Sequence, residues 1–312
     1  MPDVVTFGEV MAMFVAAQPG PLDEAEHFGV RLSGAEMNVA VGLSRLGHAV
    51  GYLGAVGDDP LGVRVRRELV AEGVDTGHLV TDPGAPTGFQ LKSRVLSGDP
   101  TVVYFRRGSA ASRLRWSGEA EKTVRSARHL HVTGIFPALT PHTRDFTFRA
   151  VEAARESGAT VSFDPNLRPV LWADENDMVD TINRLAALAD TVLPGRSEGT
   201  RLTGHENPRA IADFYLNRGA REVVVKLGSD GAAAYYRTGT VWEPAFPVRV
   251  VDTVGAGDGF AAGWISARLD GLDERAALRR ACVVGALATT SEGDKDGLPT
   301  RVELGELLDD AA

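Results

Sequence analysis

The segment of the sequence that most clearly suggests chemistry is a glycine-rich turn leading into a predicted helix, Asp252-Thr253-Val254-Gly255-Ala256-Gly257-Asp258. The backbone amides of such a turn, together with the positive end of the helix dipole, form an anion site. A bound phosphate would repel the Asp258 carboxylate unless that carboxylate accepts the proton of a hydroxyl group attacking the phosphate. The turn therefore indicates phosphoryl transfer with Asp258 as base, and the alternative is an ordinary N-cap aspartate.

Several other nucleotide and metal motifs are absent from the sequence. No Gly-x-x-x-x-Gly-Lys-Ser/Thr segment is present, and a dinucleotide fingerprint is excluded because its third glycine position is Phe260. His129 and His131 straddle a predicted strand, where packing is a better explanation than metal binding. The only cysteine, Cys282, excludes an internal disulfide and a cysteine-built metal site.

Composition narrows the partners and the location. The chain has 312 residues and a formal charge of −9, so a polyanion is not expected as its main partner. Hydrophobic residues make up 44% of the chain, enough for a core that holds a buried site. No run approaches the roughly 20 apolar residues of a membrane-spanning helix. Asp3 stands where a signal peptide would have cations, so we expect a soluble, cytoplasmic protein.

Strand-like and helix-like segments alternate along most of the chain, which predicts a mostly parallel sheet with helices on both faces. The exception is a pair of strand-like runs, Gly88–Leu96 and Thr101–Arg106, on either side of the turn signal Ser97-Gly98-Asp99-Pro100. Met11–Val15 is a candidate to pair with them. We therefore expect one α/β domain that carries a small β insertion, which could act as a lid.

Two signatures give the sequence a family resemblance. The turn from Asp252 to Asp258 resembles the C-terminal signature of the ribokinase-like (phosphofructokinase-B type) carbohydrate kinases. The N-terminal signature of that family is similar to the segment from Gly34 to Ala40, together with Leu46-Gly47 and the segment from Gly54 to Asp59. The resemblance implies a single kinase domain over residues 1–312 with a doubly wound sheet. It also implies a lid built from segments at about 11–30 and 86–108.

The same resemblance implies roles for the glycine-rich turn and for a second loop. Asp258 would be the catalytic base, with Gly255, Ala256 and Gly257 supplying amides to the transferred phosphoryl group. ATP would lie along the segment from Lys226 to Gly231, for which a plain turn is the alternative. The residues implied to contact the nucleotide are Lys226, Gly228, Ser229, Gly231, Gly255, Gly257 and Cys282.

The implied metal is Mg²⁺, bridging the phosphates mostly through water. The family's Asn-x-x-Glu element is represented here by Gly195-Arg196-Ser197-Glu198, which lacks the asparagine, so only Glu198 is carried over. A monovalent cation near Asp252 is also implied. For Cys282 the alternative to lining the adenine pocket is packing in the core.

The substrate is suggested by an apolar residue and two arginines. Met13 stands where many relatives that bind neutral sugars have an aspartate, and Arg106 and Arg168 stand at loop edges near the expected sugar site. Guanidinium groups suit a carboxylate. The same segments resemble the 2-keto-3-deoxygluconate kinases, which phosphorylate a keto-deoxy sugar acid on its terminal hydroxyl. That resemblance implies substrate contacts from Gly34, Asn38, Tyr104, Arg106, Arg168, Asp258 and Asp294.

Three alternatives remain open. Arg106 could be a solvated lid arginine, since Arg107 is adjacent and only one of the two can point inward. The enzyme could be a fructokinase or another neutral-sugar kinase, because Asp164-Pro165-Asn166-Leu167-Arg168 also occurs in such relatives. A catalytically silent sugar or nucleotide sensor is a third reading. The family also suggests a homo-oligomer that assembles through the lid.

Overall fold

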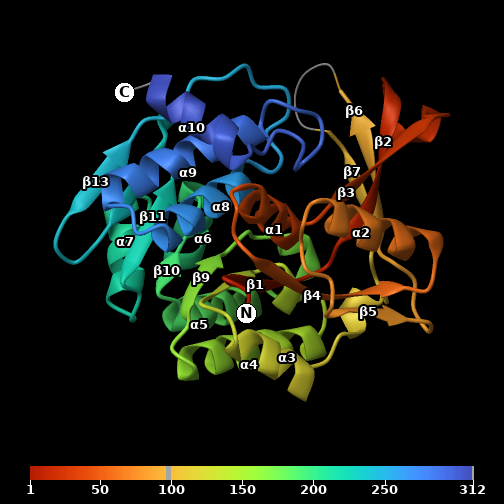
Figure 1. The fold of residues 1–312 in the computed structure, drawn as a ribbon, viewed down its shortest axis with the longest axis horizontal. Helices are drawn as coiled ribbons and strands as arrows, with labels where there is room; N and C mark the ends of the chain where they lie inside the picture. The colour runs from red at the N-terminus through yellow and green to blue at the C-terminus, as the bar shows by residue number, and fades with distance from the viewer. Residues whose placement is uncertain (96–99, 311–312) are drawn as a thin grey trace.

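The computed structural model describes residues 1–95 and 100–310, which form two β-sheets (Figure 1). The main sheet has nine strands in the order β13-β12-β11-β10-β9-β8-β1-β4-β5. Its strands are β1 (Val4–Phe7), β4 (Val50–Gly57), β5 (Leu79–Asp82), β8 (His129–Thr133), β9 (Thr160–Asp164), β10 (Thr191–Val192), β11 (Glu222–Lys226), β12 (Ala232–Tyr235) and β13 (Thr240–Glu243). Pairing is parallel from β5 to β11 and antiparallel between β11, β12 and β13. The prediction of a mostly parallel sheet is confirmed.

Helices cover both faces of this sheet. The helices are α1 (Ala35–Arg45), α2 (Pro60–Ala71), α3 (Gly118–Arg125), α4 (Pro141–Glu156), α5 (Glu175–Leu188), α6 (Arg196–Thr203), α7 (Pro208–Leu216), α8 (Ala256–Leu269), α9 (Glu274–Ala288) and α10 (Arg301–Asp310). One core cluster joins α1, α8 and α9 to the sheet, and another joins α4, α5 and α7 to the opposite face. Figure 1 shows α8 and α9 above the sheet and α3 and α4 below it.

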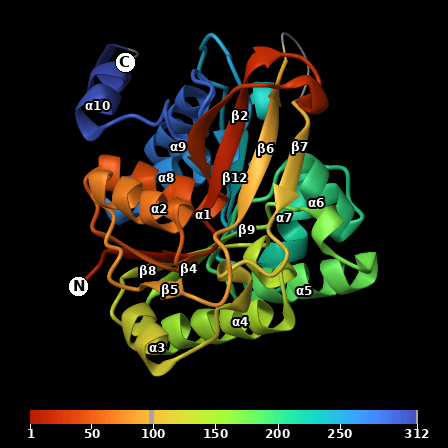
Figure 2. The same cartoon turned by 90° about the vertical axis from the view of Figure 1, so that its right-hand side faces the viewer.

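The second sheet is the lid, in the order β3-β2-β6-β7. It consists of β2 (Met11–Pro19), β3 (Phe28–Ser33), β6 (Phe89–Arg94) and β7 (Val102–Phe105). The expected antiparallel pair is β6 and β7. The anticipated pairing of Met11–Val15 with this hairpin is also present, between β2 and β6, and it is parallel. The strand β3 was not expected. Of the expected turn, Ser97, Gly98 and Asp99 lie outside the described residues. Figure 2 shows the lid strands standing along one side of the main sheet.

The sequence did not reveal α3, α6, α10 or β5. In α6 only Gly199 and Leu202 are buried, and in α3 only Ala120, Thr123 and Val124 are. With so few large apolar side chains, these helices show no apolar period. The N-cap of α2 is Asp59, whose carboxylate accepts the Gly62 N–H at 2.8 Å.

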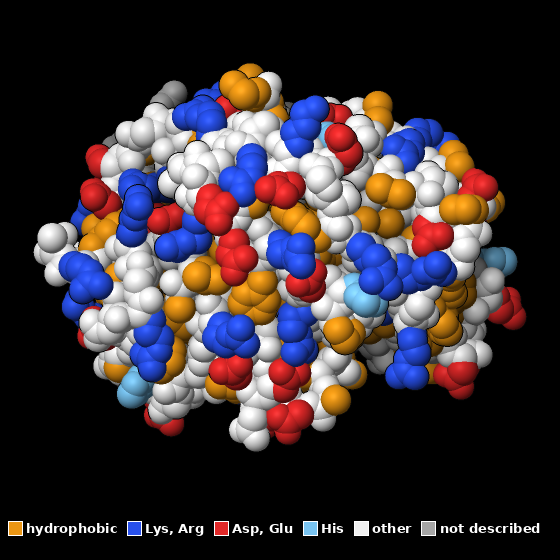
Figure 3. Space-filling model, turned by 90° about the horizontal axis from the view of Figure 1, so that it is seen from below, with side chains coloured by type: hydrophobic (Ala, Val, Ile, Leu, Met, Phe, Trp, Pro, Cys, Tyr) orange, Lys and Arg blue, Asp and Glu red, His pale blue; other side chains and the backbone are white. Residues whose placement is uncertain are grey.

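The face seen from below carries interspersed basic and acidic side chains (Figure 3). Helices on this side pair such charges, as in Arg125 with Glu121 and Glu156 and in Arg144 with Asp177. In the part of the chain that the structure describes, no helix combines the length and hydropathy needed to cross a bilayer.

Candidate active site

The glycine-rich turn lies at the start of α8, where Gly255 is the N-cap residue with φ of +85°. That backbone conformation favours glycine. A side chain at position 255 would also collide with the backbone carbonyl of Asp294. The amides in the first turn of α8 have no carbonyl partner within the helix, and that of Ala256 makes only a long contact of 3.4 Å with the Thr253 carbonyl outside it, so they can turn to an anion. The turn has the geometry expected of an anion site.

Asp258 lies at the third position of α8, so its interpretation as an N-cap aspartate is wrong. Two side-chain amides hold its carboxylate: Asn38 Nδ2 donates to Oδ2 at 2.8 Å, and Asn166 Nδ2 donates to Oδ1 at 3.1 Å. Burial raises the pKa of Asp258 to about 7, although the Asn38 hydrogen bond opposes this rise. A carboxyl group with this pKa is suited to accept a proton near neutral pH.

A cavity of about 380 Å³ opens in front of Asp258, between the lid and the carboxyl ends of the parallel strands. Ligands of doubly wound sheets bind at this edge. Nine of the predicted site residues line it: Asn38, Tyr104, Arg168, Glu198, Lys226, Gly255, Gly257, Asp258 and Asp294. Met13 also lines it, so an apolar side chain faces the cavity at the position where many relatives that bind neutral sugars have an aspartate. Glu198 and Lys226 lie on the side of this cavity that borders a second cavity.

A second, wider cavity of about 770 Å³ adjoins the first. Lys226 and Gly257 line both cavities, and Gly228 and Ala256 line the second. Lys226 Nζ is 2.6 Å from Asp164 Oδ2. Burial lowers the pKa of Lys226, but the carboxylates of Asp164, Glu198 and Asp258 together outweigh this and raise it, so the ammonium stays charged. This places a fixed cation and the free amides of α8 at the junction of the two cavities.

Five predicted site residues lie outside the lining of these cavities: Gly34, Arg106, Ser229, Gly231 and Cys282. Gly34 is flanked by Ser33 and Ala35, which do line the first cavity, and a Cβ on Gly34 would be 2.7 Å from the Glu9 carbonyl oxygen. Ser229 follows Gly228 on the loop, and Gly231 packs against the backbone of Glu243 and Pro244. Cys282 is buried in the core with Ala281 and Val283, and burial raises its pKa to about 12.

Arg106 is held by a buried carboxylate from the end of β1. Its Nε lies 2.6 Å from Glu9 Oε2, and the arginine side chain is only 10% exposed. Ser109 donates to the other Glu9 oxygen. Arg106 is therefore not a solvated lid arginine. The solvated interpretation is wrong because Glu9 is a buried partner of Arg106, which the sequence alone does not show.

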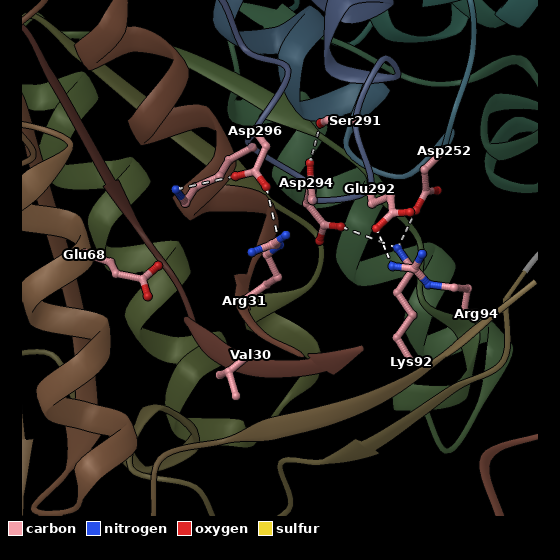
Figure 4. A network of polar contacts seen from close by, with 12 residues as sticks. Val30, Arg31, Glu68, Lys92, Arg94, Asp252, Ser291, Glu292, Asp294 and Asp296 are labelled. Carbon is pink, nitrogen blue, oxygen red and sulfur yellow. Dashed lines mark hydrogen bonds and ion pairs between the residues drawn. The ribbon is translucent and has the colours of Figure 1, made fainter. Parts of the chain in front are cut away.

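The sequence also failed to identify three residues of the site: Asn166, Asp164 and Lys92. Asn166 and Asp164 belong to the Asp164–Arg168 segment, in which only the arginine was considered. The signal that could have identified them was an amide and a carboxylate in the same short loop. Lys92 extends from β6 into the cavity, with Nζ 2.6 Å from Asp252 Oδ2 (Figure 4). The signal that could have identified it is that Lys92 is one of only four lysines in an arginine-rich chain.

Among the described residues, no group of three or more His, Cys, Asp or Glu side chains could hold a metal ion. His129 and His131 contact the Ser162 hydroxyl inside the sheet, and burial lowers each pKa to about 3. Glu198 accepts the Leu167 and Gly195 backbone N–H groups, at 2.7 and 2.8 Å. Glu198 thus presents a preorganised carboxylate to the first cavity.

Comparison with known proteins yields a family match. Residues 1–301 match the model of the pfkB family of carbohydrate kinases. A 2-dehydro-3-deoxygluconokinase of Bacillus subtilis is 50% identical over 310 residues, covering 98% of this chain and 95% of the relative. A fructokinase of Klebsiella pneumoniae is 35% identical, covering 87% of this chain and 90% of the relative.

Solved structures show the same architecture. A PfkB protein from Polaromonas sp. JS666 is 47% identical with a TM-score of 0.91, covering 98% of this chain and 99% of that one. Ribokinase II of E. coli in complex with ATP and Mg²⁺ is 30% identical with a TM-score of 0.91, covering 99% and 100%. A Vibrio cholerae fructokinase variant with fructose, ADP and potassium bound is 29% identical with a TM-score of 0.84, covering 98% of each chain.

Proposed function

Because the chain belongs to the pfkB family of carbohydrate kinases, we propose that it uses ATP to phosphorylate 2-keto-3-deoxygluconate on the terminal hydroxyl. The products are 2-keto-3-deoxy-6-phosphogluconate and ADP. The relative at 50% identity carries the name of this activity, under the synonym 2-dehydro-3-deoxygluconokinase.

The observation that carries the choice of substrate is the lining of the first cavity. Arg168 faces the same cavity as the proposed base Asp258, and Met13 replaces the carboxylate that would bind a polyol. Arg168 Nη1 donates to the Asn166 and Leu167 carbonyls, which fixes the position of the guanidinium. A sugar acid anchored by its carboxylate on Arg168 would extend its far hydroxyl toward Asp258. Arg106, steadied by Glu9, is the second proposed carboxylate partner.

In the proposed reaction, groups of this chain orient the base, deprotonate the sugar hydroxyl and stabilise the transferred phosphoryl group. Asn38 and Asn166 orient the Asp258 carboxylate, which takes the proton from the terminal hydroxyl. The hydroxyl oxygen forms a bond to the γ-phosphorus, and the bond between that phosphorus and the β–γ bridging oxygen breaks, releasing ADP. Amides of Gly255, Ala256 and Gly257 and the Lys226 ammonium stabilise the negative charge on the phosphoryl group.

ATP would lie in the second cavity, and Mg²⁺ would neutralise its phosphates. The residues fit a hydrated Mg²⁺ held largely by phosphate oxygens, because Glu198 offers a fixed carboxylate near the junction and the described residues form no cage of their own. The monovalent cation expected near Asp252 stays a prediction, and the Lys92 ammonium already contacts that carboxylate.

The discriminating experiment compares turnover of 2-keto-3-deoxygluconate and fructose by measuring ADP release. We expect a higher kcat/KM for the acid, since only the acid pairs with Arg168. Faster phosphorylation of fructose would overturn the acid-sugar assignment in favour of a neutral-sugar kinase. ADP release with no sugar of a broad panel would favour the sensor reading, which the intact turn from Gly255 to Asp258 opposes.

We also propose a homodimer formed through the lid, in the cytoplasm where ATP is supplied. Val103, Tyr104 and Phe105 on the outer strand β7 are 41%, 41% and 47% exposed. An exposed apolar edge strand is prone to pair with another chain. Light scattering of the native protein against a Val103→Lys, Phe105→Lys double variant tests this, and a native monomer would contradict it.

A further inference from the structure

Lys92 on the lid strand β6 joins two carboxylates that lie beside the glycine-rich turn (Figure 4). Its Nζ is 2.6 Å from Asp252 Oδ2 and 3.7 Å from Asp294 Oδ1. The Lys92 and Asp294 side chains are 4% and 3% exposed, and that of Asp252 is 17% exposed. We call these three residues the Lys92 bridge.

Both carboxylates of the Lys92 bridge belong to segments that shape the turn. Asp252 Oδ1 accepts the Val254 N–H at 3.0 Å, which fixes the backbone just before Gly255. The Asp294 carbonyl occupies the space in which a Gly255 side chain would lie. Asp294 Oδ2 accepts the hydroxyl of Ser33, on β3, at 2.7 Å. The lid therefore contacts both backbone segments that border the proposed phosphoryl site.

Other ion pairs between the lid and the loop that contains Asp294 are exposed. Arg94 pairs with Glu292, and Arg31 pairs with Asp296, with side-chain exposures between 36% and 52% (Figure 4). Exposed pairs of this kind contribute little free energy. By contrast, removing Lys92 would leave two largely buried carboxylates facing each other without a cation, which is strongly unfavourable.

We propose that Lys92 is a positioning residue for phosphoryl transfer. Its ammonium supplies the charge that lets Asp252 and Asp294 approach each other, and so aligns the turn amides only when the lid lies over the sugar cavity. Lid closure and assembly of the anion site thereby become one event. The inference rests on the kinase activity of the family and not on which sugar is the substrate.

Lys92→Met tests the proposal, with Arg94→Met as the matched control on the same strand. We expect Lys92→Met to lower kcat about tenfold or more while the sugar KM changes by less than about threefold. Ammonium or potassium chloride at about 100 mM should restore part of the lost kcat, because a small cation can occupy the space between the carboxylates. Tetramethylammonium chloride at equal ionic strength should not. Arg94→Met and the native enzyme should respond to these salts equally, and less than Lys92→Met does.

Two results would overturn the proposal. Unchanged kcat in a folded Lys92→Met variant would show that the turn does not need the bridge. A raised KM for the sugar acid alone, with kcat intact and no cation response, would mean that Lys92 binds the substrate carboxylate directly. If Lys92→Met fails to fold by circular dichroism, Asp252→Asn replaces it. That variant keeps the acceptor for Val254 but loses the charge that pairs with Lys92. Its kcat should fall with little change in the sugar KM, and added cations should not restore it, because Lys92 still occupies the space; an unchanged kcat would overturn the proposal. Should the native enzyme prefer a neutral sugar, that sugar is used throughout.

Discussion

Asn38 Nδ2, in the first helix, donates a hydrogen bond of 2.8 Å to Asp258 Oδ2 across 220 positions of sequence. The bond links the N-terminal signature of the family to its C-terminal one, and it leaves one face of the Asp258 carboxylate toward the sugar cavity. A general base must be deprotonated and must point toward the substrate. The Asn38 amide supports both, because its hydrogen bond stabilises the charged form of Asp258 and fixes the orientation of the carboxylate.

Asp258→Asn should lower kcat by roughly 10²–10⁴-fold, the usual contribution of a general base. Nucleotide affinity should stay within several-fold, because the turn amides and Lys226 are unchanged. Steady-state kinetics and calorimetric titration with ATP measure the two quantities. Normal turnover in this variant would place the base elsewhere.

The pH dependence of kcat/KM should report the titration of Asp258. Only the deprotonated carboxylate can take a proton, and its pKa is raised to about 7 by burial. Activity should therefore rise with pH through about 7 and level off above it. Asn38→Ala should move the midpoint to higher pH, because the Asn38 hydrogen bond lowers this pKa. A profile that is flat between pH 6 and about 8 would contradict the assignment.

Arg168→Leu should raise KM for the sugar acid by about 10–100-fold, since a hydrogen bond to a charged group contributes about 1.5–3 kcal/mol. KM for a neutral sugar should change far less. Arg107→Leu is the control, because Arg107 is an exposed neighbour of Arg106. Equal changes for acid and neutral sugars would show that Arg168 does not recognise charge.

Arg106→Leu should show the same preference for raising the KM of the acid, accompanied by a loss of stability. The variant leaves the buried Glu9 carboxylate without its cation, which costs about 3–5 kcal/mol. Thermal denaturation should show a lower Tm for Arg106→Leu than for Arg168→Leu. An unchanged Tm would mean that the Glu9 contact is not a stabilising pair.

Cys282 should react slowly with thiol reagents in the native protein, at a rate that ATP does not alter. Burial raises its pKa to about 12, so almost no thiolate exists at neutral pH. Labelling with iodoacetamide followed by mass spectrometry measures the rate. Clear protection by ATP would instead favour the predicted contact with the adenine.

The parts of the fold that repeat a local pattern could be predicted from the sequence. The alternation from β8 onward, the cap at Thr140 and the antiparallel pair in the lid all follow from residues that are neighbours in the chain. The strand β3 was missed although Phe28, Val30 and Leu32 alternate with Gly29, Arg31 and Ser33, a pattern typical of a strand. Its pairing with β2 is what the sequence could not show.

The catalytic turn was recognisable from its spacing, whereas the residues that support it were not. Asn166 adopts φ of +38° in a loop and meets Asp258 only in the folded molecule. Glu9 and Lys92 likewise have partners that no local pattern encodes, since Glu9 binds Arg106 and Lys92 binds Asp252. Long-range ion pairs of this kind depend on the docking of the lid onto the sheet.

The amides that hold Asp258 come from α1 and from the loop after β9, while Asp258 itself lies in the first turn of α8. A partly folded intermediate in which any one of these three segments is undocked has no oriented base, however much helix it contains. Regain of turnover after dilution from urea should thus trail the recovery of ellipticity, making catalysis itself the strictest gauge that the chain has reached its final state.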